Sequence, residues 1–300
     1  MEKPKIHPYI PIIIGVISVS ASAILVKLIA GVDSGVIAFY RMLFSILIMS
    51  PLFFMKYTHE LRQLKRRDWL FSIIAGIFLA FHFILWFESL RYTSVASSTV
   101  LVTLQPIFAF AGTYFFFKEI ISFKTLMSGF IAIVGSVLIS WGDLKVSGSA
   151  FYGDMLALIA CALVTGYLLF GQDVRQRLSL MTYTMLVYTA STLTLFVYVL
   201  IKEESFGPYP TIDWFWFVLL AVIPNLLGHN LFNWSLKWVS TNVLSIAILF
   251  EPIGAAILAY FIFNEHLMLT QVIGGAIVIA GIMLFVVDEK MLKKLFQKNS

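Results

Sequence analysis

The stretch Thr241–Glu265 reads TNVLSIAILFEPIGAAILAYFIFNE, and it decides how the rest of the chain is interpreted. It is long enough to cross a bilayer as a helix, which needs about 20 apolar residues. Near its middle it carries Glu251 followed by Pro252. An ionised carboxyl group at that depth costs about 3 kcal/mol, and a proline inside a helix frees a backbone carbonyl. The stretch is therefore either the core helix of a soluble protein or a membrane span with a functional interruption.

The composition favours the membrane span. The chain has 300 residues, of which 60% are apolar and 12% charged, and its mean hydropathy is +0.93, whereas soluble domains are about one quarter charged. Ten apolar runs predict an all-α integral membrane protein with ten transmembrane helices. The runs are Tyr9–Leu28, Gly35–Phe54, Trp69–Leu90, Val95–Phe117, Phe123–Trp141, Tyr152–Gly171, Met181–Ile201, Trp214–Leu236, Val243–Phe263 and Leu267–Val287. The first run lacks a small-residue cleavage site, so we expect a retained helix and not a signal peptide.

The basic residues predict how the chain is oriented. If ten helices alternate, most lysines and arginines fall on one side, and the positive-inside rule places both termini in the cytoplasm. These residues are Lys3, Lys5, Lys56, Arg62, Lys65, Arg66, Arg67, Lys118, Lys124, Arg175, Arg177, Lys237, Lys290, Lys293, Lys294 and Lys298. The net charge of +5 therefore reflects topology, and we expect no nucleic-acid partner. The basic loop 56–68 is expected to face anionic headgroups of the lipid bilayer.

Cofactors and metals are not expected. Cys161 is the single cysteine, so the chain has neither an intramolecular disulfide nor a thiol metal site. No metal-site spacing such as HExxH occurs, and asparagine is a poor transition-metal ligand. The sequence therefore predicts no cofactor, no metal site and no catalytic residue.

A repeat divides the chain into two halves. Shifting the second half by 146 residues aligns prolines, acids and glycines through three consecutive helices. The matched pairs are Gln105-Pro106 with Glu251-Pro252, Glu119 with Glu265, Gly129 with Gly275 and Gly135 with Gly281. Residues 1–145 and 146–300 then hold five helices each, and an odd number means two inverted five-helix repeats. Such repeats are typical of secondary transporters, which hold the substrate between the halves and alternate access to it.

Five side chains on two spans are candidates for substrate binding. His82 and Trp86 are four residues apart in the third span, so they share one face of a helix. Asn225, His229 and Asn233 follow at steps of four in the eighth span. Polar side chains inside a bilayer face the bundle interior or a wet cavity. They either contact substrate or form hydrogen bonds between helices, and the sequence leaves both roles open.

Three further polar residues extend the candidate site. Ser22 and Thr103 are candidates for the cavity wall, although small hydroxylated residues also serve close helix packing. Arg41 lies about two turns inside the second span. Because arginine cannot lose its charge, it needs an anionic partner, carbonyls or water. Arg41 either recognises a substrate carboxylate or is a structural anchor that snorkels outward or caps neighbouring helices.

The two repeat-related prolines define the last candidates. Pro106 and Pro252 are expected to bend their helices and to leave an unpaired carbonyl aimed at a cavity. Glu251 either carries a proton during transport or, as a neutral group, hydrogen-bonds the backbone that Pro252 loosens. Its counterpart Gln105 is uncharged, so the two halves do not carry the same proton-binding group.

Three stretches resemble the EamA-type transporters of the drug/metabolite transporter superfamily. They are AFYRMLFSILIMSP (Ala38–Pro51), FFFKE (Phe115–Glu119) and FEPIGAAILAYFIFNEHLMLTQVIGGAIVIAGIML (Phe250–Leu284). The resemblance covers nearly the whole chain. It implies a multi-pass carrier of the bacterial inner (cell) membrane, usually one that exports amino acids, related metabolites or toxic compounds.

The residues and the resemblance together predict a secondary transporter for a small-molecule substrate, with a central cavity between the two repeats. Efflux of metabolites such as amino acids, or of drug-like compounds, is the expected activity. An intramembrane enzyme is one alternative, although the acids are scattered and the histidines lie on separate helices. A channel-like pore is another, although no selectivity filter or charge ring is visible. Small residues in the fifth and tenth helices suit close packing within the chain or in a homodimer; they are Ser128, Ala132, Ser136, Ala276 and Ala280.

Overall fold

The computed structural model describes residues 6–141, 148–264 and 268–286, and its secondary structure there is helical. Eight helical segments are long and apolar enough to cross a membrane, and two shorter apolar helices complete the set. The prediction of ten transmembrane helices is confirmed. In chain order the elements are α1 (Tyr9–Ser20), α2 (Ser22–Leu28), α3 (Ser34–Lys56), η1 (Thr58–Gln63), α4 (Arg66–Tyr92), α5 (Val95–Val102), α6 (Gln105–Phe117), α7 (Phe123–Ser140), α8 (Gly148–Val174), α9 (Leu180–Ile201), α10 (Thr211–Leu220), η2 (Ala221–His229), α11 (Asn230–Ser235), α12 (Thr241–Ile248), α13 (Glu251–Phe263) and α14 (Leu269–Val286).

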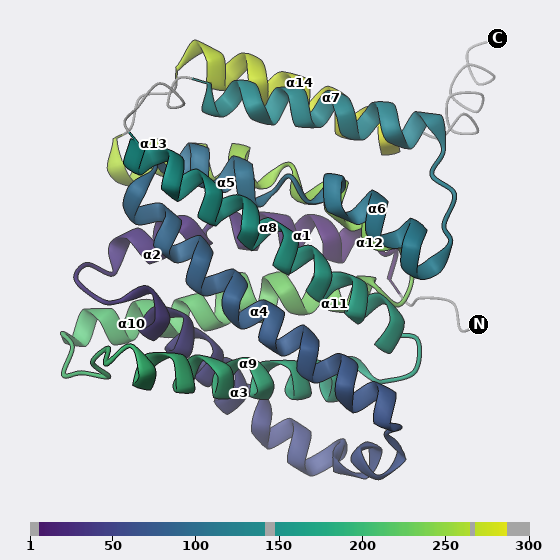
Figure 1. The fold of residues 1–300 in the computed structure, drawn as a ribbon, viewed down its shortest axis with the longest axis vertical. Helices are drawn as coiled ribbons and strands as arrows, with labels where there is room; N and C mark the ends of the chain where they lie inside the picture. The colour runs from purple at the N-terminus through teal and green to yellow at the C-terminus, as the bar shows by residue number, and fades with distance from the viewer. Residues whose placement is uncertain (1–5, 142–147, 265–267, 287–300) are drawn as a thin grey trace.

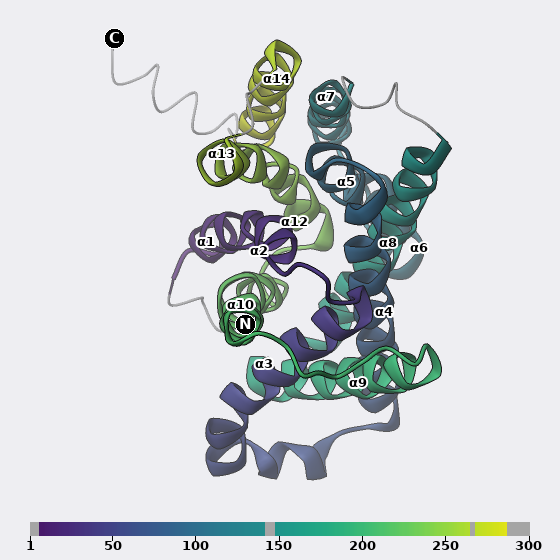
Figure 2. The same cartoon turned by 90° about the vertical axis from the view of Figure 1, so that its left-hand side faces the viewer.

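The helices lie in layers between two edge pairs (Figure 1 and Figure 2). α7 and α14 lie side by side at one edge, and α3 and α9 form the opposite edge. Between these edges α4 packs along α8, while α1 packs against η2 and α11. Each of these contacts joins one half of the chain to the other. The two halves therefore interlock, and the core lies along the interface between them.

The repeat is visible in the boundaries of the helices. α5, α6 and α7 begin and end 146 residues before α12, α13 and α14. Lys118 and Asn264, which follow α6 and α13, both have left-handed backbone, with φ of 57° and 54°. This conformation is a common way to end a helix, because it satisfies the last free carbonyls. The two inverted five-helix repeats predicted from the sequence are confirmed.

The repeat-related prolines begin new helices inside the fourth and ninth spans. α5 ends at Val102 and α6 begins at Gln105, while α12 ends at Ile248 and α13 begins at Glu251. Pro106 and Pro252 are the second residues of α6 and α13. A proline in the first turn sacrifices no helical hydrogen bond, because its missing N–H would have had no partner there. Each span is thus broken into two helices where we predicted a bend.

The eighth span contains a π-helix, η2, between α10 and α11. Its cause is visible in the repeat: α10 begins 145 residues after α4, whereas α12 begins 146 residues after α5. The second half therefore holds one extra residue in this span. A stretch of π-helix accommodates an inserted residue without ending the helix.

α7 and α14 approach closely through repeat-related glycines. A Cβ added to Gly135 would lie 2.7 Å from the carbonyl oxygen of Gly274, and one added to Gly281 would lie 2.8 Å from the backbone nitrogen of Ala132. Ser128 Oγ donates a hydrogen bond of 2.6 Å to the carbonyl of Gly281. Ser128 and Ala132 of the fifth helix therefore serve packing within the chain, whereas Ala276 and Ala280 of the tenth helix are exposed.

Some predictions concern residues outside the described ranges. Both termini, Glu265 and the boundary between residues 145 and 146 fall there. The location of the termini and the division into 1–145 and 146–300 remain predictions.

The bundle has two ends. The end that holds residues 57–65 and 175–179 is called the basic end, and the end that holds residues 29–33 and 202–210 is called the opposite end.

Candidate functional site

A central cavity lies where the two halves meet. Its wall is formed by Val19, Ser22, Arg41, His82, Trp86, Val102, Gln105, Val164, Leu168, His229, Phe232, Ile248 and Glu251. These residues come from the first, second, third, fourth, sixth, eighth and ninth spans, so both repeats contribute. The cavity volume is about 20 Å³, which is room for about one water molecule. The two halves are therefore closed around the polar side chains.

Arg41 is the cationic side chain of this cavity. It lies in the third turn of α3 and is fully buried, so it does not snorkel to the surface. Its Nη1 donates a hydrogen bond of 2.8 Å to Ser22 Oγ, and its Cζ lies 4.1 Å from the centre of the Phe83 ring. Nε and Nη2 are buried without a hydrogen-bond partner among the residues that the structure describes. Arg41 is thus fixed by the hydrogen bond from Nη1, while its other two nitrogens are available as donors.

Glu251 is the acidic side chain of the cavity. It is the first residue of α13 and is 7% exposed. It is near enough to interact electrostatically with Arg41, yet the ion pairs found within 4.0 Å in the described part of the chain all lie elsewhere. Because α13 begins at this residue, its carboxyl also lies at the positive end of a helix dipole. Opposite charges therefore face one cavity without direct contact.

His82 and Trp86 form one aromatic wall of the cavity. Their rings stack with centroids 5.8 Å apart and an interplanar angle of 22°. His82 Nδ1 donates a hydrogen bond of 2.9 Å to the carbonyl of Ala160 in α8, because a carbonyl oxygen can only accept. The neutral ring then presents Nε2 as an acceptor. This bond fixes the orientation of both rings.

His229 reaches the same cavity from the other half. Its ring meets the edge of Phe83 with centroids 5.6 Å apart and an interplanar angle of 85°. Its Nδ1 is buried and has no hydrogen-bond partner within residues 6–141, 148–264 and 268–286. His82 and His229 are not repeat-equivalent, yet both line the cavity. The structure therefore brings together Ser22, Arg41, His82, Trp86, His229 and Glu251.

Three predicted site residues do not contribute to the cavity wall. Asn225 Nδ2 donates to Ser45 Oγ on α3 at 2.8 Å, and Asn233 Nδ2 donates to Tyr167 Oη on α8 at 2.6 Å. Thr103 lies between α5 and α6, where its hydroxyl donates to the carbonyls of Thr99 and Val100. The two asparagines therefore form hydrogen bonds between helices, and Thr103 bonds its own helix. The sequence had left such structural roles open beside substrate binding.

Gln105 is a cavity residue that our site prediction omitted. It is 4% exposed, its Oε1 lacks a hydrogen-bond partner in the described residues, and it lines the cavity together with Glu251. The signal was present in the sequence, because Gln105 and Glu251 are equivalent in the repeat. Residues at equivalent positions of an inverted repeat lie at similar distances from the axis between the halves, so when one of them reaches a cavity on that axis the other does as well.

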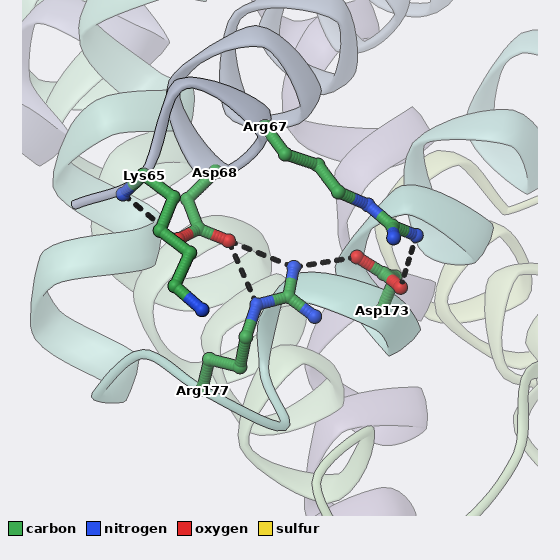
Figure 3. A network of polar contacts seen from close by, with 5 residues as sticks. All are labelled: Lys65, Arg67, Asp68, Asp173 and Arg177. Carbon is green, nitrogen blue, oxygen red and sulfur yellow. Dashed lines mark hydrogen bonds and ion pairs between the residues drawn. The ribbon is translucent and has the colours of Figure 1, made fainter.

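A second polar cluster, the ion-pair network, lies at the basic end and was not predicted (Figure 3). Arg177 bridges Asp68 of α4 and Asp173 of α8, with N–O distances of 2.7 and 2.6 Å. Arg67 pairs with Asp173 at 2.8 Å, and the backbone N–H of Lys65 donates to Asp68 at 3.2 Å. Every carboxylate of the network is therefore paired. The network joins the two halves without reaching the cavity.

The described residues hold no group of three His, Cys, Asp or Glu side chains that could bind a metal ion. Comparison with known proteins identifies the chain instead. Residues 8–141 and 151–287 each match the model of the EamA-like transporter family. The chain belongs to the EamA-like transporter family. It is accordingly a multi-pass membrane transporter and not an enzyme, with a small-molecule substrate and a bilayer as its surroundings.

Relatives of this EamA-like transporter have similar lengths. An uncharacterised transporter from Archaeoglobus fulgidus is 24% identical over 91% of this chain and 94% of its own. The riboflavin transporter ImpX of Fusobacterium nucleatum is 23% identical over 82% of this chain and 86% of its own. A solved crystal structure matches with a TM-score of 0.75 at 14% identity, covering 93% of this chain and 96% of that one. The latter likeness supports the fold alone.

Proposed function

We propose that this EamA-like transporter is a secondary carrier that exports small metabolites by alternating access through the central cavity. The observation that carries the proposal is a cavity built by both inverted repeats and lined by buried charged and aromatic side chains. Rocking of one repeat against the other would expose such a site to each side in turn. Ser22, His82, Trp86 and His229 would contact the substrate, whereas Asn225, Asn233 and Thr103 would brace the helices that hold them.

The closed cavity supports a carrier over a channel. A cavity of about 20 Å³ admits about one water molecule, so the halves have to separate before any metabolite enters. A channel would instead keep a continuous path with a filter or a ring of charges. The structure fits an occluded state between the two access states of a carrier.

The walls indicate the kind of substrate. His82, Trp86 and Phe232 give the cavity flat aromatic surfaces, which suit apolar or amphipathic solutes with ring systems. The relative named as a riboflavin transporter handles a molecule of this kind. Amino acids, related metabolites and drug-like compounds therefore remain the candidate substrates.

A two-stage experiment tests the carrier function. Growth resistance of an overexpressing strain to amino acids, analogues and antimicrobials first selects a solute, and resistance indicates export. The purified protein is then reconstituted into liposomes preloaded with that solute. Saturable counterflow is the expected result. Flux that does not saturate with solute concentration contradicts the carrier and favours a pore.

Glu251 is the group through which protons would be coupled to transport. It is buried in the cavity, so a change in its charge acts directly on the bound solute. Flux in proteoliposomes with and without a pH gradient, for the wild type and Glu251→Gln, tests this role. Loss of the gradient effect in the variant is expected. If the gradient drives the variant as well, Glu251 has the structural role only.

The placement in the bacterial inner membrane with cytoplasmic termini is proposed from the basic residues around loop 56–68. Terminal fusions to a reporter active only in the cytoplasm test it, and activity at both ends is expected. A homodimer remains a separate prediction. Ser128, Ala132 and Ser136 of α7 are buried, with Ser128 and Ala132 against α14, whereas Ala276 and Ala280 of α14 are exposed.

A further inference from the structure

The guanidinium group of Arg41 presents an unused binding edge in the central cavity. Nη1 is bonded to Ser22, which leaves Nε and Nη2 without partners among the described residues. These two nitrogens lie on one edge of the planar group. Two parallel N–H donors on that edge match the two oxygens of a carboxylate or phosphate.

The free edge is held in place by its neighbours. The guanidinium Cζ lies over the Phe83 ring, 4.1 Å from its centre, and 5.8 Å from the centre of the Phe87 ring. Together with the bond to Ser22, these contacts fix the plane and its rotation. A binding group that is already oriented loses little conformational freedom when its ligand arrives.

Among the described residues, no anionic side chain occupies this edge. Glu251 faces the same cavity, but the ion pairs within 4.0 Å in the described ranges do not include it. Gln105, which is repeat-equivalent to Glu251, brings no charge. A buried, permanently charged group with two unpaired donors is costly, and in membrane proteins such groups usually mark substrate pathways.

We propose that Arg41 is the anion-binding group of the transporter and that its substrates carry a carboxylate or phosphate group, which the Nε–Nη2 edge receives. This inference rests on the proposed carrier function. Glu251 lines the same cavity, so its negative charge repels the bound anion. Removal of Arg41 and removal of the Glu251 charge should therefore have opposite effects on anion binding, which a purely structural role of Arg41 does not predict.

Four indole compounds with one ring system and different charge provide the test. They are indole-3-acetate, 3-indoxyl phosphate, neutral indole-3-acetamide and cationic tryptamine. Binding to the purified full-length transporter is measured by titration calorimetry. We expect the wild type to bind an anion at least about tenfold more tightly than the amide. The acetate and the phosphate arms show which of the two anionic groups is preferred.

Three variants separate recognition from folding. Arg41→Gln should lose anion binding by about tenfold or more and keep its weak binding of the amide. Glu251→Gln should bind anions more tightly than the wild type. Arg67→Gln, which removes an arginine that is 62% exposed and outside the cavity, is the matched control and should bind as the wild type does. If Arg41→Gln does not fold, Glu251→Gln still decides the question.

Three results overturn the proposal: amide or tryptamine binding as tight as anion binding, an anion affinity unchanged in Arg41→Gln, or anion binding in Glu251→Gln that is no tighter than in the wild type. Failure of the carrier function is distinguishable from these. A protein that binds anions through Arg41 but shows no saturable counterflow keeps the anion site and loses the carrier mechanism. Saturable counterflow with a preference for neutral or cationic solutes keeps the carrier and removes the anion site.

Discussion

The central cavity and the ion-pair network at the basic end differ in whether their charged side chains are paired. In the network, Arg177 contacts Asp68 and Asp173 at once, and Arg67 adds a further contact to Asp173 (Figure 3). In the cavity, Arg41 and Glu251 are both buried, and neither belongs to an ion pair within 4.0 Å in the described part of the chain. The charged side chains of the network are paired with one another, and those that line the cavity are not, although Asp68 is as deeply buried as they are.

On our proposal, the charged side chains of the network stabilise the fold, whereas Arg41 in the cavity is available to bind a ligand. Breaking a paired buried charge is destabilising because its partner is left without compensation. A buried charge that is already unpaired contributes nothing of this kind, and its replacement by a neutral group leaves the fold unharmed or improves it. The two regions should therefore respond to charge removal in opposite ways.

Arg41→Gln tests the cavity side of the comparison and should have the largest effect. Transport of an anionic solute is expected to fall about 100-fold, because two charge-assisted hydrogen bonds are lost. The thermal unfolding temperature should stay close to that of the wild type. Both are measured on the same preparation. A large fall in unfolding temperature together with activity would show that Arg41 holds the fold as Asp68 does.

Asp68→Asn tests the network side. Asp68 is 3% exposed and bridges to an arginine that is 33% exposed, so we expect the free energy of unfolding to fall by about 2 kcal/mol. Transport per folded molecule should remain. Arg67→Gln is the control, since its 62% exposed side chain should contribute about 0.5 kcal/mol or less. Equal destabilisation by the two variants would show that burial of the pair does not matter.

Gln105→Glu adds a charge to the cavity at the position equivalent to Glu251. A second carboxyl near Arg41 should weaken binding of an anion about tenfold, as measured by titration. The double variant Gln105→Glu/Glu251→Gln restores the net charge of the cavity and should restore most of the affinity. An unaltered affinity in the single variant would contradict the assignment of Arg41.

Glu204 gives an intermediate case at the opposite end, outside the membrane spans. Burial, with Asp33 and Glu88 nearby and Lys202 opposing them, raises the pKa of its carboxyl from 4.5 to about 7. The unfolded chain therefore releases this proton first, and stability should fall as pH rises from about 4.5 to 7. Thermal unfolding across this range should show a shallower slope in Glu204→Gln. An identical slope would assign the pH dependence to other groups.

Much of the architecture could be predicted because it rests on local patterns. The apolar runs mark the spans, and the shift that aligns Pro106 with Pro252 also aligns the boundaries of their helices. His82 and Trp86 share a helix face because four residues complete about one turn. Inversion of the repeat follows from the odd number of helices in each half. These inferences need no knowledge of which helices touch.

The candidate site was harder to predict, because it depends on contacts between distant residues. Asn225, His229 and Asn233 follow one another at steps of four, but only His229 lines the cavity, while the asparagines meet Ser45 and Tyr167. η2 ends at His229 and changes the angle between residues along the span, which a straight-helix pattern does not anticipate. The free edge of Arg41 likewise depends on Ser22, which is remote in sequence.

The π-helix η2 also bears on the energetics of transport. Two identical inverted halves could exchange conformations, and the inward-facing and outward-facing states would then have equal energy by symmetry. The extra residue in η2 lies beside the cavity and has no counterpart in α4. The exchange therefore converts one state into a different one. Symmetry thus does not require the inward-facing and outward-facing states of the unloaded transporter to have equal energy.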